Sequence, residues 1–366
     1  MHNAATQHVK LLEAPSTARL HGLVRKAVTN FKLDLCGFNV LTEAASGYYM
    51  LTSLIAAEAG ADKVYALTKD SCYGKAADIA VATGNLVKAW GLDGKVEVFL
   101  SRKDERISRA DIVTNLGHVR PLDREFLSRL KPTAAIPLMW EAWEFRPEDL
   151  DLDYCRKIGI PVVATDEGHK LLRIMDYVGM LPVKLLLESG VEVARSQVAV
   201  LGGGKFGKTV LDALQNCGAQ TIALKPAPTR LAEKGMLQKL AACDALVVIE
   251  HVSKNLLIGR NAPLSFKKLR KINPGLVVAH IAGNIDHGDL FHSGLAFRPQ
   301  HIARPGFMSV TTDYVGPRPL IDLHTAGLKL GREMVRARRK GLSASEAEKY
   351  ALKTGFGQSM SRIKAR

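Results

Sequence analysis

Three glycines in the spacing GxGxxG are the clearest chemical signal in the sequence. Gly202, Gly204 and Gly207 follow an apolar, strand-like run and open a stretch with helical periodicity. In such a strand–turn–helix the first glycine permits a tight turn, the second lets the backbone approach a pyrophosphate, and the third lets helix and strand pack closely. The free N–H groups at the helix start also favour an anion. We therefore expect a dinucleotide to bind here. The residues expected to line it are Gly202, Gly204, Lys205, Phe206, Gly207 and His251.

The end of the next expected strand bears on which dinucleotide binds. Sites for NAD usually carry Asp or Glu there, because a carboxylate binds the ribose hydroxyls. This chain has Lys225 at that position and Arg230 nearby. A cation favours a 2′-phosphate, so the sequence predicts NADP as the cofactor. NAD is the alternative, if Lys225 only points to solvent.

Three titratable residues in the second half are candidates for proton transfer. Hydride transfer to a carbonyl or imine needs a proton donor and a cation for an anionic substrate. His324 is the expected donor, because an imidazole can hold or release a proton near pH 7; a structural hydrogen bond at a helix start is the alternative. His280 and Asp286 follow an expected buried strand, where chemistry collects in open sheets. Local capping and turn formation are the alternative for both.

Polar residues also follow three expected strands of the first half. Arg120 could bind a carboxylate through a bidentate pair. Two tryptophans beside two acids at 140–144 suggest a pocket for a flat or cationic group. The polar segment 165–170 could line the same cleft, or could cap a helix that starts there. No metal is expected, because these histidines and acids lack a ligand spacing such as HExxH. The expected substrate-binding residues are His118, Arg120, Trp140, Glu141, Glu167 and His169.

Short β-rich runs alternate with helical patterns along the chain, which predicts βαβ units and parallel sheets. Strands are expected at 38–41, 63–67, 96–100, 111–115, 134–138, 160–164, 197–201, 220–224, 245–249 and 276–280. Helices are expected at 48–59, 74–90, 168–189, from about 205, at 324–340 and at 343–354. The fold class is α/β, with two Rossmann-like doubly wound parallel-sheet domains joined by a long helix. The expected domains are 1–170, completed by the returning helix in 322–366 and binding substrate, and 171–321, binding the dinucleotide.

Composition limits the remaining possibilities. The chain has 366 residues, 47% of them hydrophobic and 24% charged, as in globular proteins with full cores. Its net charge of +15 suggests an anionic partner. The basic run within 332–340 lacks aromatic interleaving, so we interpret it as a solvated helix end and expect no nucleic acid. Five scattered cysteines without a CxxC pair, and no apolar run of the ~20 residues that a membrane span needs, predict a soluble cytoplasmic protein without membrane contact.

Several segments resemble the D-2-hydroxyacid dehydrogenases, which include the formate and glycerate dehydrogenases. The segments that carry the resemblance are 151–165, the glycine loop, 242–248, 273–278 and 323–327. The resemblance implies a dehydrogenase or reductase that uses NAD(P) on a small carboxylate-bearing substrate. It also implies a homodimer and a catalytic role for His324, with Asp313 as the candidate acid that pairs with the histidine.

The chain departs from that family at the substrate-binding arginine. The family has an Arg-Gly pair after its fifth nucleotide-domain strand, whereas this chain has no arginine in 280–286. Arg120 could replace it. The stretch between this strand and His324 is also shorter than usual. The fold is therefore expected to carry over better than the chemistry.

Three other functions remain open. An adenosylhomocysteinase-like enzyme would share the two-domain plan and use tightly bound NAD without net redox change; pyrrolysine-synthase-like proteins share the plan too. A methyltransferase would use the first domain, where 40–47 resembles an S-adenosylmethionine loop but has one glycine, and where Thr68 stands at the place of the ribose-binding acid. A non-catalytic nucleotide sensor would leave the polar strand ends without a purpose.

Overall fold

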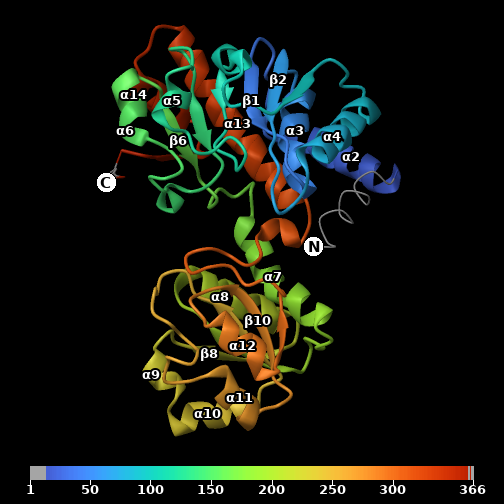
Figure 1. The fold of residues 1–366 in the computed structure, drawn as a ribbon, viewed down its shortest axis with the longest axis vertical. Coiled ribbons are helices and arrows are strands. Elements are labelled where there is room, and N and C mark those ends of the chain that lie inside the picture. Colours follow the sequence, from blue (N-terminus) through green and yellow to red (C-terminus); the bar gives the residue numbers. More distant parts are fainter. Residues whose placement is uncertain (1–13, 362, 364–366) are drawn as a thin grey trace. The chain divides into compact units, whose positions relative to one another are not determined.

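The computed structural model describes residues 14–361 and 363, which belong to two compact units (Figure 1). Unit 1 comprises Met1–Leu172 and Pro317–Arg366, and unit 2 comprises Arg173–Gly316. The sequence placed these borders after residues 170 and 321.

Unit 1 is built on a parallel sheet in the order β3-β2-β1-β4. An isolated bridge from Ile112 to Ala135 joins it to a second sheet in the order β12-β6-β5, in which only β12 is antiparallel. Because β2 and β3 lie on one side of β1 and β4 on the other, the strand order reverses between β1 and β4. The strands are β1 (Asn39–Glu43), β2 (Lys63–Leu67), β3 (Val96–Phe99), β4 (Ile112–Val113), β5 (Ile136–Leu138), β6 (Val162–Thr165) and β12 (Gly357–Ser359).

Helices pack on these sheets. The longest of them is α13 (Arg318–Arg339), near the C-terminal end of the chain. It packs against α3 and α2 and against β4, β5 and β6, as its orange-red ribbon in Figure 1 illustrates. Gly331 permits this approach, since a Cβ there would lie 2.6 Å from Ile112 Cγ2. The other helices are α2 (Ala14–Asn30), η1 (Gly47–Met50), α3 (Leu51–Glu58), α4 (Ala76–Ala89), η2 (Glu105–Arg109), α5 (Arg124–Leu127), η3 (Ala142–Glu144), α6 (Leu152–Ile158) and α14 (Ala344–Leu352).

Unit 2 contains one five-stranded parallel sheet in the order β11-β10-β9-β7-β8. Its central strand β9 is buried at every residue, as a strand covered on both faces should be. The order reverses between β7 and β9. The strands are β7 (Gln197–Leu201), β8 (Gln220–Leu224), β9 (Ala245–Ile249), β10 (Val277–Ala282) and β11 (Ala296–Arg298). The helices are α7 (Ile174–Glu188), α8 (Gly204–Asn216), α9 (Pro228–Leu231), α10 (Lys234–Ala241), α11 (Phe266–Ile272), α12 (His287–Ser293) and η4 (Thr312–Tyr314).

The predicted fold class, two Rossmann-like α/β units, is confirmed, but two helix boundaries are wrong. The helix expected from residue 168 begins at Ile174, after Arg173 with φ of +53°. The acidic segment before it forms a turn in which Asp166 Oδ1 accepts the Gly168 N–H at 3.0 Å, so it does not cap the helix. Helix α13 begins at Arg318, ahead of the expected residue 324, because Pro319 suits a first turn.

At the basic end of α13, Arg336, Arg339 and Lys340 are exposed, as expected of a solvated helix end, while Arg332 and Arg338 are partly buried. Arg339 pairs with the buried carboxylate of Asp111 at 2.9 Å, and Arg338 donates to the Leu342 carbonyl at 2.6 Å. Arg332 pairs with Glu333. The Arg339 pair therefore joins the end of α13 to the residue before β4, whereas the other two contacts link neighbours in the sequence.

Candidate functional site

The glycine loop of unit 2 lies at the point where the strand order reverses. A Cβ on Gly202 would lie 1.9 Å from the Ile249 carbonyl oxygen, and a Cβ on Gly207 would lie 2.8 Å from the Gly202 carbonyl oxygen. Gly204 has φ of +60° and begins α8, and a Cβ there would meet open space. The first and third glycines are thus required by packing, and the second leaves room above the helix N-terminus. This is the geometry expected of a dinucleotide loop.

Glu250 is a buried carboxylate at this loop that the sequence analysis missed. It follows β9 directly and is 3% exposed. Its Oε2 accepts the Gly203 N–H at 3.0 Å, and its Oε1 accepts the N–H groups of Val252 and Ser253, each at 2.7 Å. The carboxylate therefore ties the glycine loop to the segment after β9. The available signal was a charged residue directly after an all-apolar strand.

His251 lies against the other predicted loop residue, Phe206, with ring centroids 4.2 Å apart. Burial lowers the pKa of His251, so the ring is neutral. Its Nε2 is buried without a hydrogen-bond partner in the described part of the chain. Lys205, Lys225 and Arg230 are exposed, and none of them forms an ion pair with a described residue. An orphaned buried nitrogen and free cations beside a helix N-terminus fit a bound dinucleotide.

The structure places the proposed proton donors in surroundings that differ from the expectation. Both ring nitrogens of His280 are engaged: Nδ1 with Ser309 Oγ at 2.8 Å and Nε2 with the Gly283 carbonyl at 3.0 Å. Burial lowers its pKa to about 4. His280 therefore holds a loop and has no ring nitrogen left for a substrate.

His324 lies inside α13 instead of at a helix start, and it is 3% exposed. Its Nδ1 lies 2.7 Å from Thr52 Oγ1, and burial lowers its pKa to about 3. The imidazole is thus neutral and packed against α3. This geometry agrees with the alternative that His324 forms a structural hydrogen bond. A catalytic role for His324 stays a prediction.

The two candidate acids belong to unit 2. Asp286 is the N-cap of α12: it accepts the Asp289 N–H at 2.9 Å and pairs with Arg260 at 3.0 Å, which lowers its pKa to about 2. It therefore performs the capping role that was its alternative. Asp313 lies in η4, and burial raises its pKa against a hydrogen bond from Thr311. Its pairing with His324 stays a prediction, since the two residues belong to different units.

Unit 1 has its own polar cluster where its strand order reverses. Glu43 ends β1 and is 3% exposed. Its Oε2 accepts the backbone N–H of His118 at 2.8 Å, in the loop after β4. A Cβ on Gly117 would lie 3.5 Å from this oxygen and 3.8 Å from Arg120 Nη2, so the three residues adjoin. Burial raises the pKa of Glu43 to about 7, although the His118 N–H and the charges of Arg120 and Lys69 lower it.

Arg120 connects the cluster to the segment that follows β5. Its Nη1 donates to Asp149 at 2.8 Å, and its guanidinium lies 4.9 Å from the centre of the Trp140 ring. The predicted neighbours His118, Arg120 and Trp140 are thus brought together. Glu43, Thr68 and Asn115 stand at or just after the carboxyl ends of the neighbouring strands β1, β2 and β4, so they are counted with the cluster, and they were missed as site residues. Each stands at the end of an expected strand, which was the available signal.

The cluster, named here the Glu43 cluster, contains buried polar atoms with no hydrogen-bond partner among the described residues. They are Thr68 Oγ1, Asn115 Nδ2, His118 Nδ1, Arg120 Nε and Trp140 Nε1. Native proteins leave few such atoms, because each costs about 1–3 kcal/mol. Five of them after the carboxyl ends of β2, β4 and β5 therefore indicate a place for a ligand.

The remaining predicted substrate residues, Glu141, His169 and Glu167, also have partners. Glu141 accepts the Trp143 indole N–H at 2.6 Å and the Gln358 amide at 3.1 Å. The His169 and Phe356 rings are in contact in a tilted arrangement, with centroids 4.1 Å apart. Glu167 forms an interaction as well. A role in substrate binding stays a prediction for all three.

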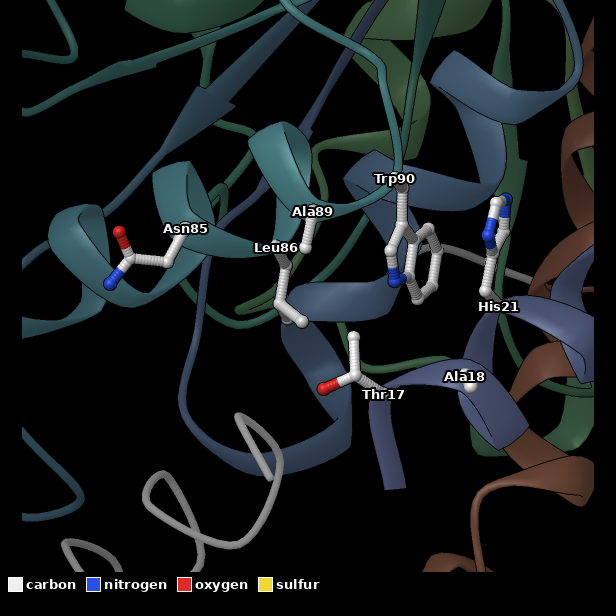
Figure 2. A pocket seen from close by; sticks show the side chains of 7 residues that line it. All are labelled: Thr17, Ala18, His21, Asn85, Leu86, Ala89 and Trp90. Atoms are coloured by element: carbon white, nitrogen blue, oxygen red, sulfur yellow. The ribbon is translucent and has the colours of Figure 1, made fainter. Parts of the chain in front are cut away.

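A cavity of about 570 Å³ in unit 1 lies apart from every predicted site residue. Figure 2 shows the His21 and Trp90 rings facing one another at its wall, with a centroid distance of 4.6 Å. His21 is engaged with Glu58 at 2.9 Å. The described residues that line it include no group of acids, bases or cations that would perform the expected chemistry. Its lining residues are Thr17, Ala18, His21, Asn85, Leu86, Ala89 and Trp90.

Three further observations concern metals, thiols and membranes. Within residues 14–361 and 363, no three His, Cys, Asp or Glu side chains form a group that could hold a metal ion. All five cysteines are free thiols. No described helix has both the length and the apolarity that crossing a bilayer requires.

Comparisons with known proteins extend these observations. No protein-family profile matches the chain. An erythronate-4-phosphate dehydrogenase of Azotobacter vinelandii is 26% identical over 187 residues, which are 50% of this chain and 47% of that protein. The chain therefore matches about half the length of this curated relative.

Solved structures match over more of the chain. The A chain of dipicolinate synthase from Bacillus subtilis has a TM-score of 0.51 at 12% identity, and the match covers 84% of this chain and 99% of that chain. The NAD+-bound 3-phosphoglycerate dehydrogenase of Entamoeba histolytica has a TM-score of 0.39 at 12% identity, covering 86% and 97%. With the two Rossmann-like units described above, the chain shares the fold of the dipicolinate synthase A chain.

Proposed function

We propose that this protein is a nicotinamide-dependent oxidoreductase that transfers hydride to or from a carbonyl or imine carbon of a small carboxylate-bearing substrate. The glycine loop carries the proposal. Its first and third glycines are required by packing, and its second opens the N-terminus of the 13-residue helix α8 to a pyrophosphate. The name of the curated relative, a dehydrogenase, supports the same reaction class.

Residues of unit 2 would hold the cofactor. The N–H groups at the start of α8 and the Lys205 side chain suit the pyrophosphate, and the orphaned His251 Nε2 suits a further polar group of the dinucleotide. Bound nicotinamide would supply or accept the hydride. Lys225 and Arg230, exposed after β8, support a preference for NADP over NAD. The Glu250 carboxylate already accepts the hydrogen bond of the Gly203 N–H, so this N–H is not available to a phosphate.

The substrate would bind in unit 1. Arg120 supplies a cation, and the unpartnered donors around it suit carboxylate oxygens. We also propose a homodimer in a reducing, cytoplasmic compartment. Five free cysteines support the compartment, and the mass from light scattering tests the dimer.

Calorimetric titration with NADPH, NADH and S-adenosylmethionine tests the function. Calorimetry is preferable to tryptophan fluorescence, because Trp90, Trp140 and Trp143 all belong to unit 1. We expect NADPH to bind most tightly, and Gly204→Val to abolish binding by placing a side chain over the helix N-terminus. Gly235→Ala is the matched control, since a Cβ there meets nothing within 4 Å.

Other outcomes separate the alternatives. Binding of S-adenosylmethionine alone would overturn the proposal and favour a methyltransferase. Tightly retained NAD without a net change in nicotinamide absorbance during turnover would favour an adenosylhomocysteinase-like reaction. Unchanged turnover in His324→Ala, with intact cofactor binding, would reject His324 as the proton donor.

A further inference from the structure

We infer that the Glu43 cluster binds a small carboxylate anion together with one proton, and that Glu43 is the residue that takes up this proton. The inference rests on the proposed function only in treating the anion as the substrate. Binding of the anion itself requires unit 1 alone, so it can be tested without a nicotinamide cofactor.

The position of the cluster is the first argument. Strands β1 and β4 are adjacent, with Leu41 opposite Val113, and the order of the sheet reverses between them. Ligands of open α/β sheets bind outside the carboxyl ends of the strands at such a reversal. Glu43 ends one of these strands, and Asn115 stands just beyond the other. Thr68 follows the next strand over, β2.

The hydrogen-bonding capacity of the cluster is the second argument. Three of its unpartnered atoms, Asn115 Nδ2, Arg120 Nε and Trp140 Nε1, can only donate. The Met139 N–H donates to Asn115 Oδ1 at 2.8 Å, which directs the amide nitrogen away from that strand. A ligand that satisfies these atoms must therefore bring acceptors, and a carboxylate brings two oxygens in one plane.

The charges of the cluster are the third argument. Arg120 is partly neutralised by Asp149, and Lys69 is exposed but close enough to act on both Glu43 and His118. Burial lowers the pKa of the His118 ring, so this imidazole is neutral. An ionised Glu43 beside a bound carboxylate would place two like charges side by side, one of them on a side chain that is only 3% exposed. Such pairs share a proton, because both groups cannot ionise at close range.

Glu43 is suited to hold that proton. Among the described residues, one backbone N–H is the single hydrogen-bond donor to its carboxylate, and burial raises its pKa to about 7 against the attraction of Arg120 and Lys69. Near neutral pH it is thus half protonated before any anion arrives. Anion binding should draw in the remaining proton, and affinity should fall about tenfold for each pH unit above 7.

Calorimetry of the full chain without cofactor tests the inference. The probes are oxalate, pyruvate and 2-oxoglutarate, with inorganic phosphate as a tetrahedral anion, at pH 6, 7 and 8. Each titration is run in two buffers of different ionisation enthalpy, which gives the number of protons taken up. At least one carboxylate should bind at pH 6, with uptake near zero there, about half a proton at pH 7 and nearly one at pH 8.

Variants assign the proton to Glu43. Glu43→Gln keeps the shape and should bind the same anion about equally at pH 6 and 8, without proton uptake. Glu348→Gln is the matched control, because Glu348 is also a partly buried carboxyl of unit 1 whose pKa is raised by burial and which accepts one backbone N–H, from Val162 at 3.0 Å. It should keep the wild-type pH dependence. Arg120→Met should weaken binding at every pH by at least tenfold.

Several results would overturn the inference. They are the absence of carboxylate binding at pH 6, binding of phosphate alone, binding without proton uptake at pH 8, or wild-type pH dependence in folded Glu43→Gln. The proposed function fails separately, through the nicotinamide titration of the same samples. Proton-linked anion binding without nicotinamide binding would retain this inference and remove the oxidoreductase.

Discussion

The two units place opposite kinds of surface at the same topological position. In unit 2 the reversal of strand order carries glycines, and the contact surface there is backbone. In unit 1 the reversal carries Glu43, Asn115 and a loop ending in Arg120, and the contact surface is side chain. Backbone N–H groups suit any pyrophosphate, whereas side chains select one substrate. The comparison therefore suggests that two units of similar fold serve different ligands, with unit 2 suited to the cofactor and unit 1 to the substrate.

A buried carboxylate stands at both positions, with different compensation. Glu43 and Glu250 are each 3% exposed and each follow a buried strand run. Three backbone N–H groups donate to Glu250, but one donates to Glu43. Burial of a carboxylate is costly unless its oxygens are satisfied. Glu250 thus links the glycine loop to the segment after β9 through three hydrogen bonds, whereas Glu43, with one, can exchange a proton.

The largest expected effect tests the backbone surface of unit 2. Gly202→Ala would place a methyl group 1.9 Å from the Ile249 carbonyl oxygen. Relieving this clash requires β7 or β9 to shift, so we expect a loss of more than ~3 kcal/mol of stability and of dinucleotide binding. Thermal unfolding and calorimetry measure both. Gly235→Ala should be neutral or slightly stabilising, and an unchanged melting curve for Gly202→Ala would contradict the packing argument.

The next effect concerns pH and the side-chain surface of unit 1. The pKa of Glu43 rises from 4.5 to about 7 in the folded protein, so the folded state binds more protons between these values. Stability from this group is full below about pH 4.5 and is lost as pH rises to about 7. Glu43→Gln should therefore be more stable than wild type by ~3 kcal/mol at pH 8 and about equal to it at pH 4. Urea unfolding at both pH values measures this, and parallel pH profiles would reject it.

A smaller effect distinguishes the two carboxylates. Glu250→Ala leaves the N–H groups of Gly203, Val252 and Ser253 without their acceptor. We expect a loss of ~2 kcal/mol at neutral pH, since each buried orphan donor is costly. Urea unfolding at pH 7 gives the value. If Glu250→Ala is as stable as wild type, the carboxylate is not the tie between the loop and β9.

The smallest effect concerns cofactor preference. Lys225→Asp should weaken NADPH relative to NADH by about tenfold, or ~1.4 kcal/mol, because a carboxylate repels a 2′-phosphate and accepts from ribose hydroxyls. Calorimetric dissociation constants for both nucleotides measure the ratio. Lys267→Asp makes the same charge change at another exposed position of unit 2 and should leave the ratio unchanged. An equal shift in both variants would reduce the effect to net charge.

The sequence by itself determined the alternating strands and helices, the two α/β units and the glycine loop, because these depend on local periodicity and on residues that meet within one turn. It also singled out His118, Arg120 and Trp140, since polar residues after apolar strands are visible in one dimension. Tertiary structure decided what these residues and the histidines can do. In the folded chain, both ring nitrogens of His280 form hydrogen bonds, with Ser309 and Gly283, which lie 29 and 3 residues away in the sequence. His324 is buried against Thr52, which lies 272 residues away. Burial and long-range partners determine the pKa of a side chain, and neither is a property of the local sequence.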